Sequence, residues 1–132
     1  MALPQPRFDQ IPPDDPRWME GARLFNRGRF FERHESWESL WHEVRGRERG
    51  LLKGLIQWAA AYHHLSRRNI SGAQRLYTTG RAHVAPWAPR HAGLRVEALV
   101  QQVDGDFARL EQGIIPSQRP TIQIDAAIVQ QG

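Results

Sequence analysis

The sequence contains no cysteine, so disulfide bridges, thiol catalysis and cysteine-based zinc sites are all excluded. It also lacks an apolar run of the length that a membrane span requires, because the most apolar stretch, residues 51–65, is interrupted by Lys53 and polar residues. Neither a glycine-rich phosphate loop nor a nucleophile elbow is present. Because no apolar segment follows the N-terminus either, we expect a soluble cytoplasmic protein with no membrane partner.

Lysine is almost as scarce as cysteine, since Lys53 is the one lysine among 18 basic residues and the rest are arginine. The formal net charge is +4, and arginines gather near two expected helix ends, at residues 45–49 and 67–68. Glu43 and Glu48 are interleaved with the first group, and no known nucleic-acid motif accompanies either. We therefore interpret both groups as solvated helix ends and expect no nucleic-acid partner.

Apolar residues at helical spacing predict an all-α fold. With 132 residues, of which 40% are hydrophobic, the chain is long enough to bury one core. We expect a single-domain bundle of about five helices, built on antiparallel helical hairpins, over residues 15–112. An extended N-terminal arm over residues 1–14 and an extended C-terminal tail over residues 113–132 should flank it. The oligomeric state stays open.

Capping and helix-breaking residues set the expected helix limits. Asp14 or Asp15, followed by Pro16, should begin the first helix, and Gly28 should end it. The other helices are expected over residues 29–45, 50–68, from a Ser71 cap to the break at Pro86, and over residues 94–111. The third of these is apolar almost all the way round, which predicts a central position. Residues 121–124 alternate like a strand laid on the body.

His34 and Glu38 interrupt the apolar stripe of the second expected helix. At about 100° per residue they project about 40° apart, and Trp41 lies about 20° to the other side of His34. Burying such groups unpaired costs on the order of 1–3 kcal/mol, which apolar stripes normally avoid. The next helix should run antiparallel and bring His63 to the level of His34. The pattern therefore predicts a polar cluster in the interior or beside a cleft.

This cluster allows three interpretations. His34, Glu38 and His63 are the candidate ligands of a divalent metal ion, the cofactor of a metal-assisted hydrolase-like site. Without a metal, His34, Glu38 and Glu35 are the candidate catalytic residues of acid–base chemistry. The third interpretation is a purely structural hydrogen-bond network. The expected walls of the site are Phe30, Trp41, Tyr62 and Gln57.

A function of a different class is also compatible with these helices. The turns of two expected helical hairpins resemble each other weakly in sequence, and their spacing is similar to that of tetratricopeptide-like pairs. A non-enzymatic helical-hairpin module that binds a protein or peptide is therefore the alternative to an enzyme, and the partner is either a small molecule or a protein.

The segment that contains the cluster resembles a known family. Residues 24–41 are similar to the signature of the bacterial, archaeal and plastid family known as domain of unknown function 309, whose hallmark HxxxExxW motif is matched by His34, Glu38 and Trp41. Residues 51–63 also resemble the family, which usually has glutamine where this chain has Lys53. Asn69 and residues 72–73 fit a third landmark. The resemblance covers roughly residues 18–84, and it implies a compact all-helical fold but no established reaction.

Overall fold

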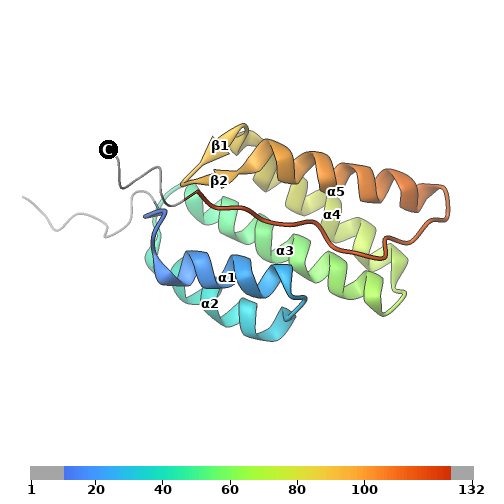
Figure 1. The fold of residues 1–132 in the computed structure, drawn as a ribbon, viewed down its shortest axis with the longest axis horizontal. Helices are drawn as coiled ribbons and strands as arrows, with labels where there is room; N and C mark the ends of the chain where they lie inside the picture. The colour runs from blue at the N-terminus through green and yellow to red at the C-terminus, as the bar shows by residue number, and fades with distance from the viewer. Residues whose placement is uncertain (1–10, 126–132) are drawn as a thin grey trace, which may run out of the picture.

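The computed structural model describes residues 11–125, and it describes residues 30–35 by their backbone alone. In this part of the chain there are five α-helices, and the other four are arranged around α3 (Figure 1). The α1–α2 hairpin lies on one side of α3, and α4 and α5 lie on the other. The helices are α1 (Pro16–Asn26), α2 (Phe30–Glu43), α3 (Glu48–Ser66), α4 (Ile70–Val84) and α5 (Val96–Glu111). The all-α prediction is thus confirmed.

The central position of α3 follows from its composition. Its buried residues face both neighbouring helix pairs, as the absence of a polar stripe predicted. None of the helices within residues 11–125 combines the length and apolar character needed to cross a bilayer. The large side chains of α3 that are almost wholly buried are Leu51, Leu52, Leu55, Trp58, Tyr62 and Leu65.

Helix α1 begins and ends at the residues that the sequence predicted. Asp15 caps it, because its Oδ1 accepts a hydrogen bond from the Arg17 backbone N–H at 2.8 Å, and Pro16 is the first helical residue. Gly28, just beyond the helix, has a φ of 75°, a conformation that glycine adopts at the lowest cost. Local chemistry therefore determines both ends of α1.

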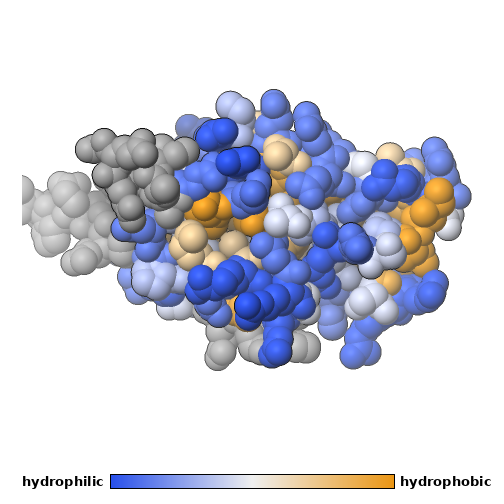
Figure 2. Space-filling model, in the orientation of Figure 1, coloured by the Kyte–Doolittle hydropathy of each residue, from blue (hydrophilic) through white to orange (hydrophobic). Residues whose placement is uncertain are grey.

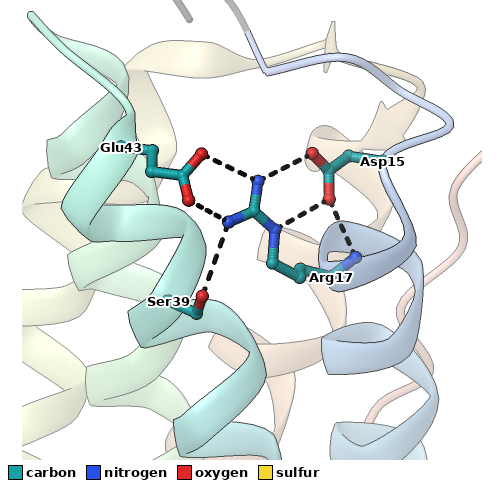
Figure 3. A network of polar contacts seen from close by, with 4 residues as sticks. All are labelled: Asp15, Arg17, Ser39 and Glu43. Carbon is teal, nitrogen blue, oxygen red and sulfur yellow. Dashed lines mark hydrogen bonds and ion pairs between the residues drawn. The ribbon is translucent and has the colours of Figure 1, made fainter. Parts of the chain in front are cut away.

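Arg17 ties α1 to α2 through a fork of hydrogen bonds (Figure 3). Its guanidinium donates to Asp15 Oδ2 at 3.1 Å and to Glu43 Oε2 at 2.7 Å, and a further bond reaches Ser39 Oγ at 3.4 Å. Two carboxylates, one at the start of α1 and one at the end of α2, thus share one planar cation. This network fixes the relative position of the two helices at one end of the hairpin.

We expect Asp15 to make the stability of the protein depend on pH. Burial raises the pKa of Asp15, but hydrogen bonds and charge from Arg17 outweigh burial and hold that pKa below its usual 3.8. A carboxylate with a depressed folded-state pKa stabilises the fold above its unfolded-state pKa, and that contribution is lost as the pH falls through the folded-state value. Asp15→Asn should therefore lower the free energy of unfolding near pH 7 and change it little at about pH 2. Urea unfolding at both pH values measures this. An equal loss at both would contradict an ionic role.

Helices α3 and α4 pack closely because two glycines face each other. A Cβ added at Gly54 would lie 2.9 Å from the Gly80 carbonyl oxygen, and one added at Gly80 would lie 3.0 Å from the Gly54 carbonyl oxygen. The buried Trp58 indole donates to the Tyr77 carbonyl oxygen at 3.0 Å beside this contact. Large side chains at either glycine would force the helices apart.

The start of α4 differs from the prediction. Asn69 caps the helix, since its Oδ1 accepts from the Gly72 backbone N–H at 3.1 Å, whereas Ser71 lies inside the first turn. Asparagine and serine are about equally good caps, so the choice depends on where α3 ends. The α3–α4 turn is short and leaves Asn69 with a non-helical ψ of 80°, which suits a cap.

The start of α5 differs as well, because Leu94 and Arg95 form a strand instead of helix. Strands β1 (Arg90–His91) and β2 (Leu94–Arg95) pair in antiparallel register, with Ala92 and Gly93 in the turn at φ values of 50° and 75°. Leu94 also forms a bridge to Ile124 in the C-terminal tail. The tail supplies this backbone partner from far along the chain, which the local spacing of apolar residues does not show.

The tail runs between α1 and α5 and crosses α3 (Figure 1). Asn26 of α1 accepts from the Ile122 N–H at 2.8 Å and donates to the Ile122 carbonyl oxygen at 3.0 Å. Gln102 of α5 accepts from the Thr121 N–H at 3.1 Å. Two amide side chains therefore hold the tail backbone from opposite sides, next to Arg119. The expected N-terminal arm lies outside the described residues up to residue 10, and the expected tail does so from residue 126.

Candidate functional site

The described part of α2 shows where Glu38 and Trp41, two predicted site residues, lie relative to the core. Trp37 and Leu40 are fully buried, whereas Glu38 and Trp41 are half-buried. Glu38 therefore lies at the border of the core, next to fully buried residues and partly open to solvent. Three predicted site residues have side chains outside the described residues: Phe30, His34 and Glu35.

Trp41 is held in place by an arginine from α3. The Arg49 Cζ lies 3.8 Å from the centroid of the Trp41 ring, and the His42 ring lies edge-on to it at 5.2 Å. The Arg49 Nε is buried without a hydrogen bond, so the indole face is what holds this side of the guanidinium. These contacts therefore fix the position of the Trp41 ring where α2 meets α3.

His63 and Gln57, both half-buried on α3, project from different sides of the helix. Their positions are about 120° apart around the helix axis, and Gln57 lies only about 60° from Gly54, which packs on α4. The Gln57 Oε1 is buried and accepts no hydrogen bond. Among the side chains that the structure describes, no three histidines or carboxylates lie close enough to hold a metal ion.

Tyr62, another predicted wall residue, lies between α3 and α5. Its hydroxyl donates to Asp106 Oδ2 at 2.6 Å, and its ring packs edge-on to Phe25 at 6.2 Å and to Phe107 at 5.8 Å. Burial and the hydrogen bond to Asp106 raise the pKa of the Tyr62 hydroxyl, so this group remains a donor. Tyr62 also lines a cavity between the end of α3 and the tail.

Arg119, in the tail, is a cation with a buried nitrogen, and no carboxylate that the structure describes forms an ion pair with it. Its Nη1 is buried and makes no hydrogen bond within the described residues. Its Cζ lies 5.9 Å from the ring centroids of both Phe25 and Tyr62. Burial lowers the pKa of Arg119, yet a guanidinium stays charged at neutral pH. The rings compensate only part of the cost of desolvating this charge.

Two adjoining cavities open beside Arg119, and we call them together the tail cleft. Their volumes are about 410 and 260 Å³, and residues 115–119 line both. In the larger cavity, Asp106 accepts a hydrogen bond from Arg109 at 2.8 Å in addition to the one from Tyr62. In the smaller cavity, Arg68 lies at the rim with a φ of 62°, in the left-handed region that favours glycine. The cleft therefore carries three arginines and one carboxylate, and that carboxylate is already bonded.

A histidine–glutamate pair exists at the other end of α3. Glu48, the first residue of α3, is 3% exposed, and its Oε2 is hydrogen-bonded to the Nε2 of His91 in β1. The Trp87 ring covers the imidazole at a centroid distance of 4.3 Å. A cavity of about 490 Å³ borders both residues, and Glu48 Oε1 is buried there without a hydrogen bond. This pair joins the start of α3 to the β-hairpin.

The sequence reasoning did not single out Asp106, although a signal was present. Asp106 follows Leu99 and Val103 and precedes Leu110 at helical spacing, on the apolar stripe of α5. The test that selected His34 and Glu38, a charged residue within an apolar stripe, selects Asp106 equally. Arg119 carries no such signal, because it lies between prolines in a segment without periodicity.

Comparison with known proteins shows one similarity, over the helical hairpins. A family model described as "Domain of unknown function (DUF309)" matches residues 18–76, which span α1, α2, α3 and the first half of α4. No curated protein matches the chain. The matched segment contains the α2 border and Tyr62 but not Arg119 or His91. Residues 18–76 are therefore similar to the domain of unknown function 309 family, in agreement with the resemblance of the sequence motifs.

Proposed function

We propose that this protein binds a small anionic ligand in the tail cleft and that Arg119 is the main anchor. The observation that carries this proposal is the position of Arg119, which lines both cavities while its Nη1 has no hydrogen bond and no carboxylate of the described residues pairs with it. Buried polar groups in proteins are almost always satisfied, and buried charges are paired. A ligand carboxylate or phosphate in the cleft would supply the missing negative charge and an acceptor for the half-buried guanidinium.

The surroundings of Arg119 support an anion over a cation. Asp106 is the acidic residue among the cleft walls, and the bonds from Tyr62 and Arg109 already use both of its oxygens. Arg68 adds a second positive charge at the rim. Because Asn26 and Gln102 clamp the adjoining backbone, Arg119 is positioned before a ligand arrives, which lowers the entropy lost on binding.

Removing the Arg119 charge should abolish the response of the protein to small anions. A ligand at about 100 times its Kd stabilises the folded state by about 2.7 kcal/mol, so binding raises the Tm. We expect acetate or inorganic phosphate, added at constant ionic strength, to raise the Tm of the wild type but not that of Arg119→Gln. Arg119→Lys should respond weakly, because an ammonium lacks the planar pair of donors.

The matched control is Arg75→Gln, which removes one exposed arginine of α4 that does not line the cleft. This variant should respond to anions like the wild type. Equal responses of the wild type and Arg119→Gln, with both folded by circular dichroism, would contradict the proposal and leave Arg119 as a packing residue on Phe25 and Tyr62.

A second candidate function belongs to the α2–α3 border, where His34, Glu38 and His63 would carry out acid–base or metal-assisted hydrolysis. The observation that favours it is the half-buried position of Glu38 beside the fully buried Trp37, within the family segment. A polar group at the border of the core can exchange protons with a substrate in a way that a fully buried one cannot.

Metal analysis and one substitution test this second function. Protein purified without an affinity tag should carry close to one equivalent of a divalent transition metal if the three residues are ligands, and His34→Gln should lose that metal while remaining folded by circular dichroism. If His34→Gln instead lowers the stability by about 2–3 kcal/mol and no metal is found in either protein, the cluster is a structural network.

A further inference from the structure

The walls of the tail cleft narrow the class of anion that would bind there. Arg119 is the arginine of the cleft that combines a buried nitrogen with a lack of hydrogen bonds, whereas Arg109 is bonded to Asp106. One guanidinium presents a planar pair of donors that matches a single carboxylate. Arg68 lines the smaller cavity and not the larger one. In the larger cavity, where Arg109 and Asp106 form an ion pair, Arg119 carries the one uncompensated charge among the wall residues, and this balance suits a monocarboxylate.

Part of the wall of the larger cavity is apolar, beside polar residues such as Gln102 and Ser117. Ile114, Ile115 and Pro116 lie on one side, and Pro120 follows Arg119. Ile114 is 50% exposed, and among the described residues it is the one large hydrophobic side chain with such exposure. In the view of Figure 2, hydrophobic surface is visible at the end of the molecule where α5 turns into the tail. Exposed apolar surface beside a polar anchor is typical of sites that take an amphiphilic ligand.

The size of the cleft limits the ligand. Volumes of about 410 and 260 Å³ lie near the lower end of the roughly 300–1,000 Å³ range of small-molecule sites. Because residues 115–119 line both cavities, a ligand anchored at Arg119 can extend along Ile115 without leaving the cleft. A free small molecule fits this space better than an extended peptide.

We propose that the ligand of the tail cleft is a small monocarboxylic acid with an apolar chain, whose carboxylate is held by Arg119 and whose chain lies on Ile114, Ile115 and Pro116. This inference rests on the proposed function and adds the chemical class of the ligand. No bond is made or broken, because the site holds the acid and does not transform it.

A homologous series of acids tests the assignment. Isothermal titration at constant ionic strength should show affinity rising from acetate through butyrate to hexanoate, by about threefold to fourfold for each methylene that is buried. Hexanamide, which has the same chain without the charge, should bind at least tenfold more weakly than hexanoate. Arg119→Gln should remove the difference between hexanoate and hexanamide. Ile114→Ser, an exposed substitution that should leave the fold intact, should flatten the dependence on chain length.

The outcomes separate the two proposals. If acetate binds through Arg119 but chain length and Ile114→Ser have no effect, or if inorganic phosphate binds more tightly than hexanoate, the assignment of an apolar acid is wrong and anion binding stands. If no anion binds in a manner that depends on Arg119, both are wrong. A peptide such as N-acetylglycylleucine that binds more tightly than hexanoate would overturn the free acid and point to a peptide C-terminus.

Discussion

Gly21→Ala should destabilise this protein more than any other single-methyl change. A Cβ at Gly21 would lie 2.0 Å from the Trp37 Nε1 and 2.2 Å from its Cδ1, far inside van der Waals contact. The Trp37 ring has no room to retreat, because it is fully buried, packs on Trp18 and Phe25, and donates to the Trp18 carbonyl oxygen at 3.3 Å. Overpacking of this severity costs about 3 kcal/mol or more.

Gly105→Ala is the matched control, since Gly105 is also a helical glycine but has open space. The nearest heavy atom to a Cβ at Gly105 would be the Arg109 Nη1, at 3.7 Å. Alanine has the higher helix propensity, so this change should stabilise the protein by about 0.5–1 kcal/mol. Urea unfolding of the two variants should therefore give changes of opposite sign. Two changes of the same sign would show that the α1–α2 contact yields more easily than its geometry indicates.

The fold was predictable where local chemistry decides it. Asp15, Pro16 and Gly28 determine the ends of α1 through capping, fixed proline geometry and a positive φ, and each of these acts within a few residues. The central place of α3 follows from apolar residues on almost every side. The close approach of α3 and α4 at Gly54 was less accessible, because a glycine within a helix does not reveal which neighbour it faces.

The C-terminal half of the candidate site was not predictable in the same way. Arg119 is positioned by Asn26 and Gln102, whose amides could only be assigned to the tail once the tertiary fold was known. Leu94 pairs with His91 in the β-hairpin and also forms a bridge to Ile124 in the tail, against the helical spacing of its own neighbourhood. Contacts between segments that are distant in sequence therefore decided both the cleft and the missed start of α5.

The prediction of a functional site at the α2–α3 border still rests on the sequence, where His34 and Glu38 interrupt an apolar stripe. That reasoning has a general weakness that Asp106 shows. A carboxylate on the apolar stripe of α5 is paired with Tyr62 and Arg109, so a polar residue within a stripe indicates a buried network as readily as a reactive one. Substitution of the polar residue can tell a buried structural network from a reactive site, whereas the sequence pattern cannot.

Tyr62→Phe should have the second large effect on stability, because it leaves the Oδ2 of the buried Asp106 without its donor, while Arg109 still donates to Oδ1. Tyr62 is 4% exposed and Asp106 is 8% exposed, and their hydrogen bond of 2.6 Å lies in the core between α3 and α5. Hydrogen bonds to charged groups contribute about 1.5–3 kcal/mol to stability, and the Asp106 oxygen that loses its donor adds the cost of an unsatisfied buried group. We therefore expect a loss of about 2–3 kcal/mol in the free energy of unfolding.

Tyr77→Phe provides the comparison that isolates burial as the cause. The Tyr77 hydroxyl is also hydrogen-bonded to an α5 carboxylate, that of Asp104, and burial together with Asp104 raises the pKa of Tyr77 to about 12. Asp104, however, keeps two hydrogen bonds from Arg81 and remains open to water, so its loss of one donor is largely compensated. The expected loss is below about 1 kcal/mol. Because both substitutions preserve the ring, a Tyr62→Phe effect as small as that of Tyr77→Phe would show that water reaches Asp106 through the tail cleft and replaces the missing donor.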